Sequence, residues 1–390
     1  MKPVSLRKRI AALFLRFLNS FHKTEKFSPG KVRKVLVYGY TGLGNFILYT
    51  PALKAIRNFL PAAQFTLLYG ESTGCEEAVT GSALFDCYLH LDRNAGWKKR
   101  LKWLWTNRHE KYDLVISEFH NDFFFLALLT LLSGHGWRLG HVSSPGWKSD
   151  WDWLYDIPVR MEEDQHEIDR YLELAYALGI ERGSVDKSPW MALRAEDRQF
   201  AEQFLISHGV RRDRPIVNVQ MGTSPENRWK QWDLKKFHDL CEKILELSDC
   251  ALVLHGAPGE KEMIGRVAEK LSRKPILAAG ETTIKQAAAI VELSSLLVCN
   301  DSGLMHVAAA MGTPVTAIYG PTDYRRTAPY GKDHRILRKD LACSPCFRLE
   351  GTAAVLNCPY AHQCLHEITV DEVFESVKAH LHLKFPSAAV

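Results

Sequence analysis

Two successive runs of alternating strand and helix signals constrain the fold of this chain more than any other feature. Short apolar segments, each followed by a turn and a helical stretch, recur from about Val32 onwards. This order is typical of parallel βαβ units. The predicted strands are 34–38, 64–69, 87–91 and 113–119 in the first half and 215–220, 251–256, 276–280, 296–299 and 315–319 in the second. The sequence therefore predicts an α/β protein with two Rossmann-like parallel sheets.

Helical spacing of apolar residues predicts the segments between the strands. The expected helices are 50–60, 72–79, 97–108, 122–132 and 163–178 in the first half and 233–247, 260–271, 283–293 and 303–311 in the second. Thr50 is expected to cap the first of them, with Pro51 at its first position. The section from 134 to 158 is rich in Trp, Gly and Ser and is expected to be irregular.

The length of 390 residues favours two domains, because single hydrophobic cores rarely keep growing beyond about 250–300 residues. Residues 182–189 have the composition of a linker, so we expect an N-terminal domain at 32–190 and a C-terminal domain at 191–368. Two sheets of this kind place a cleft between their carboxyl ends. Thr369 and Glu372 form a capping box for a last helix at about 370–382, which we expect to return towards the N-terminal domain within the segment 369–390.

The basic character of the chain lies in its N-terminal arm, residues 1–31. Residues 1–34 contain ten Lys/Arg and one acid, Glu25, a local charge of +9, whereas the whole chain has +5. Seven apolar residues follow helical spacing on one face of the arm: Leu6, Ile10, Leu13, Phe14, Phe17, Leu18 and Phe21. An amphipathic helix on an anionic membrane surface fits this pattern. The alternatives are a helix docked on the protein itself, a disordered arm, and a signal peptide, against which Arg16 and the lack of a small-residue cleavage site argue.

Composition argues against a membrane-spanning protein, a disulfide-rich secreted protein and a nucleic-acid-binding protein. The longest apolar run, 123–132, is shorter than the ~20 residues of a membrane span. Nine cysteines in a long chain favour free thiols in a reducing compartment. Nucleic-acid binding is not expected, because the basic residues outside the arm form no groove-sized pattern and no reader motif is present.

The segment from Leu296 to Tyr319 predicts one βαβ unit with a polar turn at its centre. Asp301 is expected to cap the helix, Gly303 lets a ligand come close to the backbone, and His306 lies about one turn inside. The N-terminus of a helix in this position favours a phosphate. The alternative is an ordinary buried unit in which Asp301 only caps and His306 only packs.

Three other patterns are weaker. The loop Gly39-x-x-Gly42-x-Gly44 lacks the spacing of a dinucleotide-binding loop. Asp150-Trp151-Asp152 has the form of a metal-binding Asp-x-Asp motif, but it follows no apolar strand, so a metal site is not expected there. The cysteines Cys343, Cys346, Cys358 and Cys364 have a spacing that is open to two interpretations, a zinc or functional cysteine cluster and packed free thiols.

Several motifs in chain order resemble one family. GLGNFILYTPALKAIR, GTSPENRWKQW, HGAPGEKE, NDSGLMHVAAAMGTPVTAIYGPTD and the closing CSPC…ITVDEV are similar to the bacterial lipopolysaccharide heptosyltransferases, glycosyltransferase family 9. The resemblance covers about 34–380. It implies a GT-B fold with two Rossmann-like domains facing a cleft and an inverting transfer that needs no metal or other cofactor. The implied donor is a nucleotide sugar, most readily ADP-heptose, which the C-terminal domain would hold. The implied acceptor is a lipid-linked saccharide such as the lipopolysaccharide core.

The resemblance also assigns donor-side residues. Lys230 matches the lysine of the family's K-x-W motif, Glu260 matches its ribose-binding acid, and Asp301 with His306 matches its donor-binding pair. Positive groups aimed at a departing diphosphate stabilise the transition state. Lys230 is the leading cation, and the further groups expected to bind phosphate oxygens are Thr223, Ser302 and the backbone N–H groups of Gly303 and Leu304. Solvated charges at helix starts are the alternative for Lys230 and Glu260.

On the acceptor side the chain departs from the family at Asn45, in the loop of Gly42 and Gly44, where members commonly carry the aspartate that serves as base. An amide cannot accept the proton, although it can orient an acceptor. The substitutes considered are Glu71, Glu118, His120 and Asp122, with Glu118 and Asp122 preferred. We therefore expect a heptosyltransferase on the cytoplasmic face of the inner membrane. The alternatives are a transferase with another nucleotide sugar and acceptor, a catalytically inactive sugar-nucleotide-binding module, and an epimerase of the same architecture.

Overall fold

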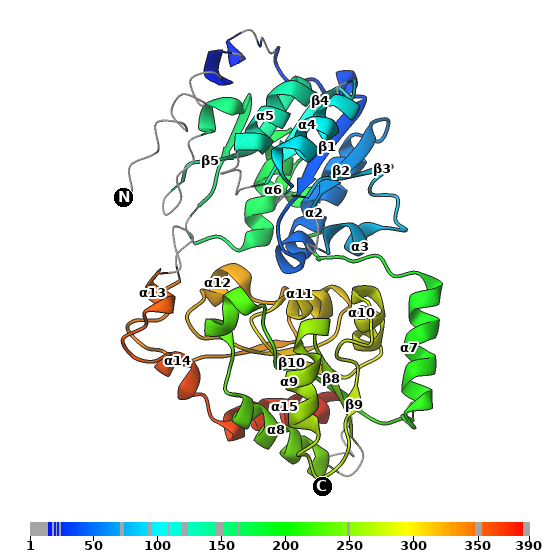
Figure 1. Ribbon diagram of the computed structural model, residues 1–390, viewed down its shortest axis with the longest axis vertical. Helices are drawn as coiled ribbons and strands as arrows, with labels where there is room; N and C mark the ends of the chain where they lie inside the picture. The colour runs from blue at the N-terminus through cyan, green and yellow to red at the C-terminus, as the bar shows by residue number, and fades with distance from the viewer. Residues whose placement is uncertain are drawn as a thin grey trace. The chain divides into compact units, whose positions relative to one another are not determined.

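The computed structural model divides the chain into two compact units, residues up to Lys187 and residues from Ser188 onwards (Figure 1). The boundary lies within the linker-like segment 182–189. The structure describes residues 15–17, 19–20, 22, 25–70, 74–92, 95–107, 109–118, 124–144, 151–162, 164–211, 213–247, 250–347 and 353–384.

The N-terminal unit is built on a six-stranded parallel sheet with the order β3-β2-β1-β4-β5-β6. Its strands are β1 (Lys34–Gly39), β2 (Gln64–Tyr69), β3 (Cys87–His90), β4 (Tyr112–Ser117), β5 (Gly134–Val142) and β6 (Ile157–Arg160). Its helices are η1 (Pro29–Lys31), α2 (Leu43–Phe59), α3 (Cys75–Val79), α4 (Trp97–Thr106), α5 (Phe124–Ser133), η2 (Asp152–Leu154), α6 (Glu167–Ala177) and η3 (Arg182–Ser184). The strand order reverses between β1 and β4, which is where doubly wound sheets bind ligands.

The C-terminal unit repeats this arrangement with the order β12-β11-β10-β7-β8-β9, again all parallel. Its strands are β7 (Ile216–Gln220), β8 (Ala251–His255), β9 (Ile276–Leu277), β10 (Leu296–Asn300), β11 (Val315–Ile318) and β12 (His334–Leu337). Its helices are α7 (Ala195–Ser207), η4 (Pro225–Lys230), α8 (Leu234–Glu246), η5 (Pro258–Glu260), α9 (Lys261–Ala268), α10 (Ile284–Glu292), α11 (Gly303–Ala310), α12 (Tyr324–Thr327), α13 (Ala353–Leu356), α14 (Gln363–His366) and α15 (Val370–Lys384). The reversal point lies between β7 and β10. Two parallel sheets confirm the predicted fold class.

The predicted start of the first helix was wrong. The helix α2 begins at Leu43, so Pro51 lies inside it and Thr50 caps nothing. A proline at this position leaves the carbonyl of Ile47 without its usual N–H partner. The Thr50 hydroxyl donates to that carbonyl at 2.7 Å, which compensates for the missing backbone bond and lets the helix continue.

The expectation of an irregular segment at 134–158 was also wrong, because β5 and β6 lie within or overlap it. The sequence of β5 contains Arg138, a residue that rarely occupies a buried strand. Arg138 is nevertheless almost fully buried, and its guanidinium donates to the side chain of Asn19 at 2.5 Å and to the carbonyl of Leu154. These partners lie 119 and 16 positions away in the sequence, so the composition of β5 alone gave no sign of them. The strand β12 and the helix α7 were likewise not predicted.

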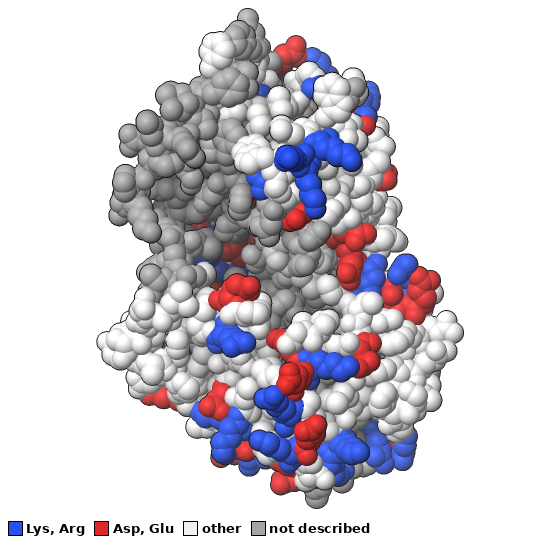
Figure 2. Space-filling view, in the orientation of Figure 1, with Lys and Arg blue, Asp and Glu red and all other residues white. Residues whose placement is uncertain are grey.

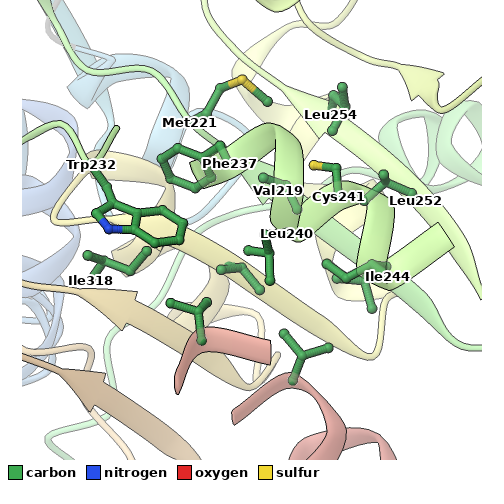
Figure 3. Close-up of a cluster of buried hydrophobic side chains, with 14 of the residues drawn as sticks. Val219, Met221, Trp232, Phe237, Leu240, Cys241, Ile244, Leu252, Leu254 and Ile318 are labelled. Carbon is green, nitrogen blue, oxygen red and sulfur yellow. The ribbon is translucent and has the colours of Figure 1, made fainter. Parts of the chain in front are cut away.

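One face of α8 lies in the core of the C-terminal unit (Figure 3). Trp232, Phe237, Leu240 and Ile244 are buried against the strands, with Val219 on β7. The helix α15 starts with the predicted capping box, since Thr369 N donates to Glu372 Oε2 at 2.8 Å and Glu372 N donates to Thr369 Oγ1 at 3.2 Å.

The apolar face of α15 completes this core. Val373, Val377 and Leu381 are buried in the same cluster as α8. The helix therefore packs on its own unit. That it also returns towards the N-terminal domain stays a prediction.

Among the described residues, none of the helices has the length and apolar content required to cross a membrane.

Candidate active site

Three turns meet at one edge of the C-terminal sheet. The strand β7 pairs with β10 on one side and β8 on the other, so the turns after all three strands leave the sheet side by side. Asn300 Nδ2 donates to the carbonyl of Met221 at 3.0 Å, and Ser302 Oγ donates to Gln220 Oε1 at 2.6 Å. These two bonds fasten the turn after β10 to the turn after β7. The structure thus brings together donor-side residues that the sequence placed on three separate strand ends.

Lys230 and Asp301 form an ion pair across this edge, with 2.8 Å between Lys230 Nζ and Asp301 Oδ2. The Asp301 side chain is 7% exposed and the Lys230 side chain 20%. Lys230 also lies over the ring of Trp229, with Nζ 5.3 Å from the ring centroid. The Lys230 side chain is therefore held in place and stays partly exposed, which suits a cation that binds an anionic ligand.

The predicted capping role of Asp301 was wrong. Ser302 occupies the N-cap position of α11, and its side chain makes no capping bond. The Asp301 carboxylate instead pairs through Oδ2 with Lys230, 71 positions earlier in the sequence. No N-cap side chain therefore covers the first N–H groups of α11, those of Gly303 and Leu304. Unpaired N–H groups at a helix start favour an anion.

Glu260 lies beside the turn after β7. Its Oε2 accepts a bond from Ala257 N at 2.8 Å, and its Oε1 would be 2.0 Å from a Cβ atom added to Gly222. Glycine at position 222 therefore makes room for this carboxylate. Burial raises the pKa of Glu260, and the bond from Ala257 opposes this shift. A half-buried carboxylate that uses one oxygen for the backbone keeps the other available for a hydroxyl group.

Thr223 and His306 complete the predicted donor-side set. The Thr223 hydroxyl is buried and forms no hydrogen bond with any described residue. His306 is buried in α11, one turn after the Ser302 cap. Sequence reasoning missed the supporting residues Gln220, Gly222 and Asn300. Gly222 directly precedes Thr223 after a predicted strand, and this was the one available signal.

In the N-terminal unit, Asn45 and Glu118 follow two strands that pair in the sheet, β1 and β4. Asn45 lies in the first turn of α2, whose N-cap is Gly42 and whose second residue is Gly44. Glu118 directly follows β4, and its Oε1 accepts a bond from Tyr40 N at 2.9 Å, so the carboxylate is tied to the loop that leads to Asn45. Desolvation by burial and the nearby charge of Glu118 raise the pKa of Tyr49 and of Tyr171. Glu71, His120 and Asp122 lie outside the described residues.

The four C-terminal cysteines line one cavity of about 310 Å³, together with Pro321 and Tyr360. Burial, followed by the charges of Cys346, Cys358 and Cys343, raises the pKa of Cys364 to about 11. In the described part of the chain, no group of three or more His, Cys, Asp or Glu is arranged to hold a metal ion. All nine cysteines are free thiols. The cysteines are gathered around one cavity as free thiols, and the zinc interpretation stays an untested hypothesis.

The Asp150-Trp151-Asp152 pattern has a structural role at its second acid. Asp152 Oδ1 accepts a hydrogen bond from Ser143 N at 2.9 Å. Asp152 is also the first residue of the short helix η2. Asp150 lies outside the described residues.

The comparisons with known proteins identify the family. Residues 102–355 match the family described as glycosyltransferase family 9 (heptosyltransferase), which is well over half of the chain. The chain belongs to glycosyltransferase family 9. The predicted resemblance is confirmed, and the two six-stranded parallel sheets are those of the GT-B fold. The protein is accordingly a glycosyltransferase of the heptosyltransferase family.

Relatives of this family 9 transferase match over nearly its whole length. The lipooligosaccharide heptosyltransferase 2 of Campylobacter jejuni is 25% identical over 353 residues, 88% of this chain and 97% of the relative. Among solved structures, a family 9 transferase from Veillonella parvula has a TM-score of 0.76 at 22% identity, covering 92% of this chain and 99% of that one. The Escherichia coli ADP-heptose lipopolysaccharide heptosyltransferase II has a TM-score of 0.71 at 21% identity, covering 90% and 99%.

Proposed function

We propose that this protein transfers heptose from ADP-heptose to an acceptor of the lipopolysaccharide-core type, with inversion at the anomeric carbon and without a metal ion. The observation that carries the proposal is the meeting of Lys230, Thr223, Glu260 and the start of α11 at one sheet edge of a family 9 chain. ADP-heptose is the donor named for the Escherichia coli relative.

In this proposal, the sheet edge binds the donor diphosphate and stabilises it as it leaves. Negative charge grows on the diphosphate during the displacement, and donors fixed in advance lower the barrier. Lys230 supplies the positive charge, and Asp301 holds its ammonium group in position. The Thr223 hydroxyl and the N–H groups of Gly303 and Leu304 bind phosphate oxygens, and His306 belongs to the donor site from the same helix, α11. Glu260 accepts hydrogen bonds from the ribose hydroxyls.

The acceptor must lose a proton during an inverting transfer. Asn45 cannot take it but can orient the acceptor hydroxyl. We assign the base to Glu118, because its carboxylate is bonded to Tyr40 N in the loop that leads to Asn45. Asp122 is the second choice from the sequence. We propose in addition that the enzyme acts on the cytoplasmic face of the inner membrane, with the basic arm at an anionic lipid surface beside a lipid-linked acceptor.

Two alternative functions are considered, one because of Asn45 and one because of what the relatives leave open. Asn45 in the place of the usual aspartate favours an inactive module that only binds a nucleotide sugar. The relatives do not fix the base of the nucleotide for this chain, so a transferase with another nucleotide sugar and acceptor is the second alternative.

The decisive experiment is a thermal-shift series with ADP-, GDP-, UDP- and dTDP-sugars on the native protein and on Lys230→Ala. A ligand present at about 100 times its Kd stabilises the native state by about 2.7 kcal/mol, so the cognate donor gives the large shift. We expect ADP-heptose to give this shift. In a transfer assay with the same donor, we expect Lys230→Ala to lower kcat by about 10²–10³-fold, because one preorganised donor is lost.

Lys235→Ala is the matched control, because Lys235 lies five positions away on α8 with its side chain 83% exposed. A large shift with another nucleotide would replace ADP-heptose as donor. Full transfer activity in Lys230→Ala would overturn the role of Lys230.

The assignment of the base has its own test. Glu118→Gln retains the shape and a polar side chain but removes the proton acceptor. We expect it to abolish transfer while donor binding stays as in the native protein. Asp122→Asn provides the comparison, and full activity in Glu118→Gln together with a loss in Asp122→Asn would move the base to Asp122. Donor binding without transfer in the native protein would favour the inactive module.

A further inference from the structure

The helix α4 of the N-terminal unit presents an apolar stripe to solvent. Trp97, Leu101 and Trp105 follow each other at intervals of four residues and therefore lie on one face. Their exposed fractions are 57%, 58% and 69%. None of the ten residues of α4 is buried. Single exposed apolar residues are ordinary on protein surfaces, but two tryptophans and a leucine in one row form a patch, which is rare outside binding surfaces.

The face of α4 that adjoins the stripe is attached to the unit, which fixes the direction of the stripe. Trp103 Nε1 donates to the carbonyl of His90 at 2.9 Å, and Trp103 and Leu104 pack against the cluster that contains Phe125 and Leu129. The guanidinium carbon of Arg100 lies 5.2 Å from the ring centroid of Phe125. Arg100 also lies 5.8 Å from the ring centroid of Trp97, so it joins the anchored face to the exposed stripe.

Positive charge borders the stripe. Lys98, Lys99 and Lys102 are exposed on the turns between and beside the apolar residues, and the helix contains no acidic residue. In Figure 2, Lys and Arg side chains gather where Figure 1 shows α4. Tryptophan, leucine and lysine on one exposed helical surface have the composition of helices that lie in the plane of a membrane interface. Tryptophan in particular prefers the level of the lipid headgroups.

We propose that α4 is a membrane-docking helix, which inserts Trp97, Leu101 and Trp105 among the headgroups of anionic phospholipids while its lysines contact the phosphates. The charge of the helix selects this occupant over a protein partner, since a protein interface core is depleted in lysine whereas an anionic bilayer attracts it. The inference goes beyond the proposed function, because it holds whichever sugar is transferred and it does not depend on the N-terminal arm.

The test uses the full chain and hydrogen-exchange mass spectrometry, which separates α4 from the arm. The probe is a set of vesicles of phosphatidylcholine with phosphatidylglycerol, compared with vesicles of phosphatidylcholine alone. We expect slower amide exchange in the peptide covering 97–106 with the anionic vesicles only. We expect the triple change Trp97→Ser, Leu101→Ser, Trp105→Ser to abolish this protection and to reduce vesicle co-sedimentation at least tenfold.

Two further variants make the result specific. Ile206→Ser is the matched control, because Ile206 is 60% exposed on helix α7 of the other unit, and it should bind vesicles as the native protein does. Lys98→Gln with Lys102→Gln leaves the apolar stripe intact and should weaken binding by about fivefold per charge.

The proposal also predicts which readout stays constant. Donor-induced thermal stabilisation should be the same in the triple variant and the native protein, so a folding defect or a failure of the proposed function would be recognised separately. Unchanged exchange in 97–106 on anionic vesicles would overturn the proposal. So would native-like co-sedimentation of a folded triple variant, or protection of α4 that depends on protein concentration without lipid, which would indicate a second copy of the chain as the occupant.

Discussion

Gly222 is the residue on which the position of Glu260 depends. A Cβ atom at position 222 would lie 2.0 Å from Glu260 Oε1 and 2.3 Å from its Cδ, and all three of its nearest neighbours would be atoms of this carboxylate. A flexible carboxylate can rotate away from such a contact at small cost. We therefore expect Gly222→Ala to weaken donor binding at least tenfold while Tm changes little, as measured by calorimetric titration and thermal unfolding.

Gly265→Ala is the control for this prediction. Gly265 lies in α9, and a Cβ atom added to it would meet nothing within 4 Å. Alanine there should leave the donor affinity unchanged and stabilise the helix by about 0.5–1 kcal/mol. Native donor affinity in Gly222→Ala would mean that Glu260 does not contact the donor.

His255 at the end of β8 should make stability depend on pH. Burial lowers the pKa of this imidazole from 6.5 to about 4, and its Nε2 lies 2.8 Å from Asn218 Oδ1. The unfolded chain takes up a proton near pH 6.5 whereas the folded protein does so only near pH 4. The unfolded state therefore binds more protons between these values, and stability falls as the pH falls through this range.

The measurement is urea unfolding of the native protein and of His255→Gln at several pH values. We expect the native protein to lose on the order of 3 kcal/mol more than the variant between pH 6.5 and 4, because each pKa unit corresponds to about 1.4 kcal/mol. Parallel stability curves for the two proteins would contradict a neutral buried His255.

At the scale of elements, α15 depends on its first turn. Thr369 and Glu372 bond each other reciprocally, and Lys339 Nζ lies 2.6 Å from Glu372 Oε1. The helix in turn buries Val373, Val377 and Leu381 in the core of the C-terminal unit. Loss of the capping hydroxyl should therefore reach the whole unit.

We expect Thr369→Ala to lower the free energy of unfolding of the C-terminal unit by about 1 kcal/mol, the usual effect of removing an N-cap side chain. Thr369→Ser retains the hydroxyl and should restore most of this loss. The measurement is chemical denaturation, and equal midpoints for Thr369→Ala and the native protein would show that the cap contributes nothing.

At the scale of the whole molecule, all proposed donor-side residues belong to the unit from Ser188 onwards. This unit has its own six-stranded sheet and a core that includes α15. We expect the fragment 188–390 to unfold cooperatively and to be stabilised by the cognate nucleotide as the full chain is, in a thermal-shift assay.

A fragment ending at residue 369 tests the same idea from the other side. It lacks α15 and exposes the apolar surface of α8, so it should fail to give a cooperative transition. A fragment 188–390 that folds but does not respond to nucleotide would show that the donor site needs residues of the N-terminal unit.

Local sequence determined most of the elements and the architecture. The strands β1, β2, β7 and β10 are apolar runs that need no distant partner to be recognised, and the alternation with helices implies parallel sheets. The motif residues also predicted which side chains meet at the edge of the C-terminal sheet, since the carboxyl ends of neighbouring parallel strands lie side by side.

Tertiary structure decided what each local signal could not contain. Arg138 can lie buried in a strand because Asn19 and Leu154 supply hydrogen-bond partners. Asp301 pairs with Lys230, and the N-cap of α11 is Ser302. The exposure of Trp97, Leu101 and Trp105 is of the same kind, because it depends on which face of α4 the rest of the unit covers. Sequence patterns report periodicity along the chain, whereas burial and ion pairing depend on residues that only folding brings together.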